Sequence, residues 1–169
     1  MLTKENLKYY AGPCLFFLML LDGQLTRLIE YWTEGMYIAS VHFLLLGLMC
    51  ASMVLPKSYM MLTGLILGTV FDFYYIGVLG IYAVVLPLMI WLMFVLAPIL
   101  YENTFTLFFG SIIMVTCYEL FTLGIQLIFQ LTQVDPMFFV ARFLGPTLLL
   151  NMIIFILFIY PFKKLFQVK

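Results

Sequence analysis

Charged residues are scarce in this sequence. They make up 9% of its 169 residues, while hydrophobic types make up 66%, and a soluble globular domain carries roughly a quarter charged residues. The net charge is zero, which argues against a nucleic-acid partner. A bilayer core of about 30 Å needs roughly 20 apolar residues per helix, and nearly every charge here lies between runs of that length. The composition therefore predicts an all-α integral membrane protein embedded in the lipid bilayer.

Residues and motifs that carry chemistry are also few. The cysteines Cys14, Cys50 and Cys117 lie in apolar runs without CxxC or His–Cys spacing, which favours small core residues. The single histidine, His42, has no carboxylate or cysteine at ligand spacing, so we expect a structural or interface residue. GK[ST], GxSxG and HExxH motifs are missing. We therefore expect a protein that is not an enzyme and has no metal or cofactor, and we interpret its many Phe and Tyr residues as lipid-facing and interface side chains.

The apolar runs predict six membrane-spanning helices in a single polytopic domain, residues 1–169. The polar connection Glu102-Asn103-Thr104 supplies an N-cap candidate for the fifth helix, and Asp135 followed by Pro136 marks the start of the sixth. Pro56 ends the second. The expected spans are about 8–28, 36–55, 58–75, 78–100, 104–133 and 136–162.

The stretch GLILGTVFDFYYIGVLGIYA is the most informative part of the chain. Gly64, Gly68 and Asp72 recur every fourth residue, so they share one face of a helix that is able to pack against another helix. Gly77 and Gly80 follow and indicate a tight turn. The stretch predicts a helical hairpin that is packed through small residues and carries one acid.

The distribution of basic residues predicts the orientation in the membrane. If both termini are cytoplasmic, only Arg27 and Arg142 lie towards the outside, and six lysines lie on the cytoplasmic side, as the positive-inside rule requires. These are Lys4, Lys8, Lys57, Lys163, Lys164 and Lys169.

Ionisable groups within the spans point to the outer half of the membrane. At 1.5 Å per residue, counting Asp22 from Lys8 and Asp72 from Lys57 at the cytoplasmic end, and Arg142 from the outer start of the sixth span, all three fall in that half. Polar residues at spacings of three and four form a stripe along the fifth helix: Glu119, Thr122, Gln126, Gln130 and Gln133. The sequence therefore predicts a polar seam or shallow cavity there, lined by the first, third, fifth and sixth spans.

Three interpretations of this seam stay open. The acids pair with Arg142, glutamines and backbone groups inside the chain, or the seam docks a partner's transmembrane helix, or it holds a small molecule or ion. Three acids against one arginine leave at least one acid hydrated, protonated or paired outside the chain. This excess of acid motivates the docking interpretation.

The Asp22-Gly23 end of the first span and the central pattern of Gly64, Gly68, Asp72 and Gly77 resemble the bacterial rod shape-determining protein MreD family over nearly the whole chain. The resemblance implies a multi-pass protein of the bacterial cell membrane with a fold like the S-component of energy-coupling-factor transporters. It also implies a non-enzymatic subunit of the elongation machinery, which maintains cell shape and helps place peptidoglycan synthesis. The partners it implies are MreC, MreB, RodA and a class B penicillin-binding transpeptidase.

Our hypothesis is that the outer seam and the glycine face bind MreC. An alternative is the substrate-binding subunit of an energy-coupling-factor type transporter for a vitamin or metal. Such subunits typically present an Ala-x-x-x-Ala face on the first helix, but Ala11, Leu15 and Met19 occupy that spacing here. The candidate partner-binding residues are Asp22, Gly64, Gly68, Asp72, Gly77, Gly80, Glu119, Gln126, Gln130 and Arg142.

Overall fold

The computed structural model describes residues 4–34, 38–77, 80–133 and 135–168, and its regular elements are all helical. The π-helices η1 and η2 continue their neighbours directly, so the described residues form six helical segments. The predicted all-α class is confirmed. The elements are α1 (Lys4–Trp32), α2 (Phe43–Ser52), α3 (Lys57–Phe71), η1 (Asp72–Ile76), α4 (Tyr82–Leu100), α5 (Thr104–Ile128), α6 (Pro136–Phe138), η2 (Phe139–Leu144) and α7 (Gly145–Leu165).

Four helical segments in the described part of the chain are long and apolar enough to cross a membrane. They correspond to the first, fourth, fifth and sixth predicted spans. α2 has only 10 residues, and α3 has 15 before its π-helical continuation. The chain is therefore a multi-pass membrane protein. The four segments are Leu7–Trp32, Tyr82–Leu100, Thr104–Ile128 and Phe139–Leu165.

The prediction of a continuous helix over residues 36–55 is wrong in its first half. α2 begins only at Phe43, and residues 38–42 have no regular secondary structure, while 36 and 37 lie outside the described residues. The backbone of 38–42 binds to other helices instead of to itself: the Val41 N–H donates to Oγ1 of Thr26 over 3.0 Å. Hydropathy counts apolar residues and does not detect such remote partners.

α2 lies at the centre of the fold, and all ten of its residues are buried. α1, α4 and α7 pack around it. A helix that is apolar on every side requires such an enclosed position. The location of α2 places its N-terminus, with its unpaired backbone N–H groups, inside the protein.

α3 and α4 form the predicted glycine hairpin. A Cβ on Gly68 would collide with the carbonyl oxygen of Tyr82, and a Cβ on Gly64 would collide with Cδ1 of Ile90. The two helices therefore approach through the face that carries these glycines. The predicted turn is also confirmed, because Gly77 has φ 72° and begins the connection to α4.

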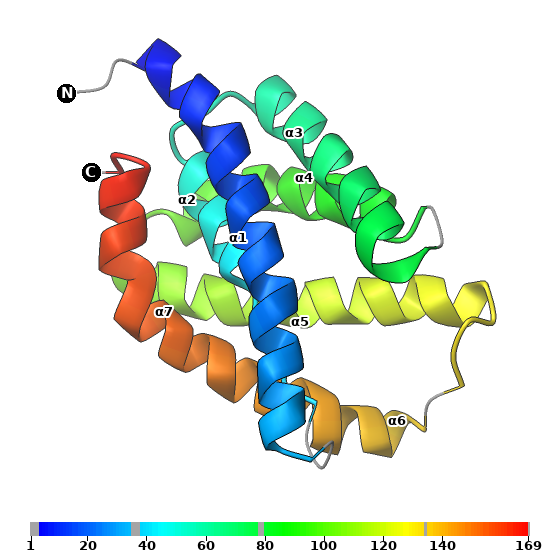
Figure 1. Ribbon diagram of the computed structural model, residues 1–169. Coiled ribbons are helices and arrows are strands. Elements are labelled where there is room, and N and C mark those ends of the chain that lie inside the picture. The colour runs from blue at the N-terminus through cyan, green and yellow to red at the C-terminus, as the bar shows by residue number, and fades with distance from the viewer. Residues whose placement is uncertain (1–3, 35–37, 78–79, 134, 169) are drawn as a thin grey trace.

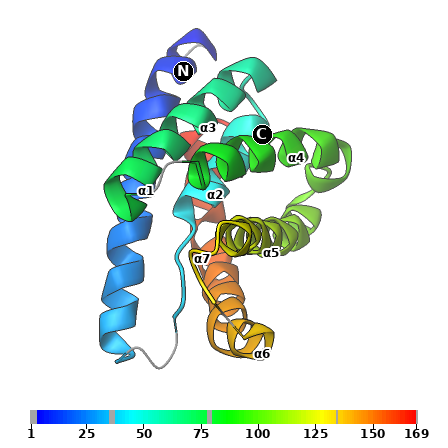
Figure 2. The same ribbon diagram turned by 90° about the vertical axis from the view of Figure 1, so that its right-hand side faces the viewer.

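Figures 1 and 2 show both termini at the same end of the molecule, together with the start of α3. This end carries Lys8, Lys57, Lys163 and Lys164. The lysines therefore gather at one end, as their distribution predicted, although the cytoplasmic location of that end stays a prediction. α1 and α5 diverge towards the opposite end, where α6 and η2 lie (Figure 1).

Candidate functional site: the outer cavity

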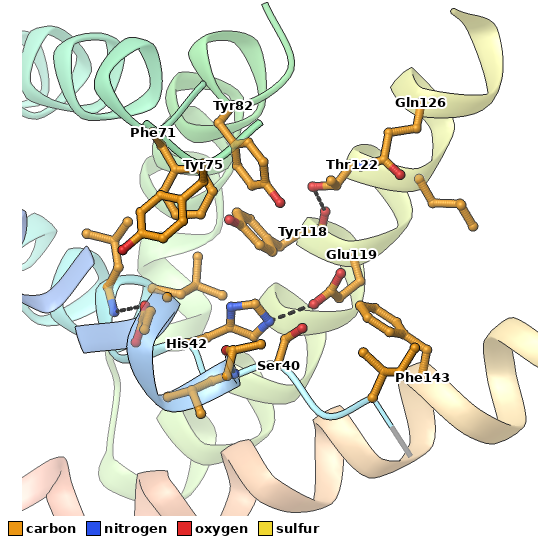
Figure 3. A pocket seen from close by; sticks show the side chains of 18 of the residues that line it. Ser40, His42, Phe71, Tyr75, Tyr82, Tyr118, Glu119, Thr122, Gln126 and Phe143 are labelled. Carbon is orange, nitrogen blue, oxygen red and sulfur yellow. Dashed lines mark hydrogen bonds and ion pairs between the residues drawn. The ribbon is translucent and has the colours of Figure 1, made fainter. Parts of the chain in front are cut away.

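A cavity of about 480 Å³ lies between the second half of α1, the start of α2 and the segment before it, the turn end of the α3–α4 hairpin, α5 and η2. We call it the outer cavity. Its volume falls within the range of ligand-binding pockets, and its mainly apolar lining with a few convergent polar groups is typical of them. Six parts of the chain contribute residues that line it (Figure 3): Asp22, Gly23, Thr26 and Arg27 of α1; Ile38, Ser40, Val41, His42, Leu44 and Leu45; Phe71 and Tyr75; Tyr82 and Leu86 of α4; Tyr118, Glu119, Thr122, Leu123 and Gln126 of α5; and Phe138, Phe139 and Phe143.

Asp22 borders this cavity but is already fully engaged by backbone groups. Its Oδ1 accepts from the N–H of Phe43 over 2.7 Å, and its Oδ2 accepts from the N–H of Leu44 over 2.8 Å. Asp22 therefore caps the N-terminus of α2 from another helix. A helix N-terminus carries unpaired donors and a partial positive charge, both of which stabilise a carboxylate.

Asp72 has the same role for α4. It is fully buried and accepts from the N–H groups of Gly80 over 2.8 Å, Tyr82 over 2.8 Å and Ala83 over 3.1 Å. It does not line the outer cavity. The acid of the predicted hairpin therefore closes that hairpin, by capping its second helix.

Glu119 pairs with His42 inside the cavity wall. Oε1 of Glu119 lies 2.7 Å from Nε2 of His42, and the two side chains are only 7% and 9% exposed. The sequence analysis looked for an acid at short spacing from His42 and found none. It missed this pair because the two residues are 77 positions apart. Oε2 of Glu119 has no hydrogen-bond partner among the described residues and borders the open cavity (Figure 3).

The position of His42 is set by the backbone around it. Its N–H donates to Oδ1 of Asn151 over 3.0 Å, and Nδ2 of Asn151 donates to the Ser40 carbonyl over 2.7 Å. The Ser40 N–H donates to Oγ1 of Thr147 over 3.1 Å. α7 therefore holds the non-helical segment 38–42 in place, and this segment presents His42 to Glu119 on α5.

The predicted polar stripe on α5 divides into two parts. Glu119, Thr122 and Gln126 line the outer cavity. Gln130 and Gln133 are exposed and lie beyond the end of the helix, which stops at Ile128 rather than near residue 133. Only the first part of the stripe therefore belongs to the cavity.

The predicted pairing of Arg142 with the buried acids is wrong. Arg142 is exposed, and its guanidinium lies over the ring of Phe138, 5.7 Å from the centroid. Its backbone faces inward instead, since its carbonyl accepts from the Ile38 N–H over 3.1 Å. The arginine that lines the cavity is Arg27, whose guanidinium lies 5.3 Å from the ring centroid of Tyr75.

Aromatic rings form a continuous wall along the cavity. Phe71 contacts Tyr75 and Tyr82 with ring centroids 4.7 and 4.3 Å apart. Tyr82 lies 5.9 Å from Tyr118, whose ring meets His42 edge-on at 4.9 Å. We call Phe71, Tyr75, Tyr82 and Tyr118 the aromatic wall. Interpreting these aromatics only as lipid-facing or interface residues missed it, since the wall joins residues of three helical segments: α3 with η1, α4 and α5.

Comparison with known proteins agrees with the architecture and the resemblance. The family model described as rod shape-determining protein MreD matches residues 3–169. The chain is also 29% identical to the rod shape-determining protein MreD of Bacillus subtilis (strain 168) over 129 residues, which cover 74% of this chain and 73% of that protein. No solved structure matches, so the expected likeness to transporter S-components has no support. Since the family match covers nearly the whole chain, the protein belongs to the MreD family of rod shape-determining proteins.

Proposed function

We propose that this chain is a non-enzymatic membrane subunit of the bacterial elongation machinery that binds MreC at the outer cavity. Through MreC it helps organise MreB, RodA and a class B penicillin-binding transpeptidase during peptidoglycan synthesis. Membership of the MreD family supports the role in rod shape. The observation that carries the docking proposal is the outer cavity itself, which opens between helices of the bundle. Within the described residues, every fully buried side-chain nitrogen and oxygen atom already has a hydrogen-bond partner.

The structure narrows the set of direct contacts in this proposal. Gly64 and Gly68 face α4, so that face is already covered within the chain. We assign these glycines, the turn glycines Gly77 and Gly80 and the capping acids Asp22 and Asp72 to shaping the cavity and its surroundings. We assign direct contact with MreC to Glu119 and Gln126 in the cavity and to Gln130 beyond it. Arg142, which is exposed beside Phe138, is an outer contact in this proposal.

The orientation proposal follows from the gathered lysines. If the lysine-bearing end of α1, α3 and α7 is cytoplasmic, as the positive-inside rule predicts, the outer cavity faces the extracytoplasmic side. The docking segment is then the outer part of MreC's membrane helix or the residues that follow it. The transporter alternative has no support from the comparisons, and we do not carry it further.

A cavity-filling substitution tests the docking proposal. Leu123 lines the outer cavity, and Leu123→Trp places a bulky ring in the space that a docking helix needs. We expect MreC co-purification to fall at least about tenfold, because overfilling an interface removes its complementarity.

The matched control is Leu120→Trp, on the exposed face of the same helix. It adds the same ring where lipid, rather than cavity, surrounds the side chain, so MreC recovery is expected to stay within about twofold of wild type. Equal recovery of MreC with both variants and with wild type would rule out the outer cavity as the docking site.

A further inference from the structure

The buried acids Asp22, Asp72 and Glu119 differ in how many of their carboxylate oxygens already accept a hydrogen bond. Asp22 and Asp72 have both oxygens bound by N–H groups of helix N-termini. Glu119 has one oxygen bound to His42, and its Oε2 has no partner in the described part of the chain. Its side chain is 7% exposed and borders the outer cavity. Glu119 is therefore the buried acid with unused capacity to accept a hydrogen bond or an ion pair.

The surroundings of that oxygen favour a cation. The aromatic wall runs along the same cavity and ends at Tyr118 and His42, next to Glu119 (Figure 3). Ring faces attract ammonium and guanidinium groups, and a carboxylate in a poorly solvated site forms its strongest hydrogen bonds with charged donors. A carboxylate beside several aromatic rings is thus a suitable environment for a basic group with an apolar stem.

The chain's own cavity cation does not fill this position. Arg27 lies against Tyr75, at the opposite end of the aromatic wall from Glu119. The structure shows no ion pair between Arg27 and an acid within the described ranges. His42 already binds Oε1 of Glu119. A second basic group, at Oε2, must therefore come from another molecule.

We propose that Glu119 and the aromatic wall receive a single basic side chain, Arg or Lys, from the helix or adjoining segment that docks at the outer cavity. This inference rests on the proposed function, and it names the chemistry by which the partner is recognised. An apolar side chain in the same place would cover Oε2 without replacing its hydrogen bonds to water, which is unfavourable. An acidic side chain would be repelled.

The test compares two neutralising substitutions in the purified chain, using full-length MreC as the probe and measuring Kd in nanodiscs. Glu119→Gln removes the charge but keeps the size and an oxygen that His42 is able to reach. We expect it to weaken binding about tenfold or more, the effect of truncating a buried charge pair. The control Glu30→Gln removes the same charge from an exposed position of α1 and is expected to change Kd by less than about twofold.

The partner side of the pair identifies the basic residue. Each Lys and Arg in the membrane helix of MreC and the residues flanking it is replaced by Gln in turn. We expect one replacement to weaken binding as much as Glu119→Gln, and the two changes together to have no more effect than either alone, which is the signature of direct coupling. If no replacement couples with Glu119→Gln, the inference is wrong.

Two further outcomes separate this inference from the docking proposal. If wild type binds MreC and Glu119→Gln binds equally well, the inference fails while the docking proposal stands. If wild type does not bind MreC at all, both fail. If Glu119→Gln does not fold, the variant Thr122→Lys is used in its place. This substitution introduces a cation of the chain itself one helical turn from Glu119. It is expected to block binding, and wild-type affinity of this variant would also overturn the inference.

Discussion

Asp72 provides the sharpest prediction. The sequence suggested that it contacts a partner protein, whereas in the structure it caps a helix of the same chain. Asp72→Ala removes a fully buried carboxylate that accepts three N–H groups at the start of α4. Distances of 2.8, 2.8 and 3.1 Å are those of well-formed hydrogen bonds. The substitution leaves these donors unpaired in a part of the protein that is poorly hydrated.

The magnitude follows from the number and type of these bonds. A hydrogen bond to a charged group contributes about 1.5–3 kcal/mol net, but burying the carboxylate itself costs several kcal/mol, so the three contributions do not simply add. We expect Asp72→Ala to lower the free energy of unfolding by about 3–5 kcal/mol, which is typical of breaking a buried charged interaction. For a chain of this size the midpoint of thermal unfolding should then fall by about 6–20 °C.

The assay is thermal unfolding of purified protein in one detergent, followed by circular dichroism. Asp135→Ala is the matched control, since Asp135 also caps a helix but is exposed and accepts the Phe138 N–H at 3.3 Å. Loss of this exposed cap should lower the midpoint by at most about 4 °C. Recovery of MreC per folded molecule should be unchanged in Asp72→Ala.

Two outcomes would refute this reasoning. An unfolding midpoint for Asp72→Ala as close to wild type as that of Asp135→Ala would show that the cap contributes little to stability. Full stability together with loss of MreC binding would return Asp72 to the partner interface that its spacing with Gly64 and Gly68 first suggested.

Two other predictions concern packing and the non-helical segment. Gly68→Ala should lower the free energy of unfolding by about 1–3 kcal/mol, because its Cβ meets backbone atoms of α4 that are unable to move aside. The control Gly124→Ala, where a Cβ meets open space, should not lower the midpoint of thermal unfolding. Equal effects of the two substitutions on that midpoint would contradict the close packing of the hairpin. Asn151→Asp keeps the acceptor for the His42 N–H but loses the donor to the Ser40 carbonyl. Amide hydrogen exchange of residues 38–42 should therefore become at least about tenfold faster. Unchanged protection of these amides from exchange would show that Asn151 does not hold the segment.

The sequence predicted the features that depend on composition and on short-range spacing. Scarce charge and long apolar runs predicted a helical membrane protein, and the spacing of Gly64, Gly68 and Asp72 predicted a hairpin, which the structure confirms. The lysines were predicted to gather at one end. The connection Glu102-Asn103-Thr104 was predicted to supply a cap for α5, and Asn103 is that cap, in a reciprocal arrangement with Thr106. Each of these features depends on residues that are close in the chain or on averages over a window.

The partners of the buried polar groups were not predictable in this way. One of the three interpretations paired the acids with Arg142, glutamines and backbone groups inside the chain, and its backbone part is confirmed for Asp22 and Asp72, which bind helix N-termini. The sequence did not indicate which N–H groups these would be. Backbone N–H groups are present at every residue except proline, so no sequence pattern marks which of them will bind a remote carboxylate. Arg142 was expected to pair with the buried acids, yet its side chain, on η2, is exposed.

The sequence by itself determined that the chain lies in a membrane, where most of its helices occur and how its charges divide between two ends, because hydrophobicity and periodicity are local properties. Only the tertiary structure decided that residues 38–42 of one apolar run remain non-helical, that His42 meets Glu119, and that one carboxylate oxygen borders an open cavity. These features arise from contacts between residues tens of positions apart, and their energies depend on which groups exclude water together.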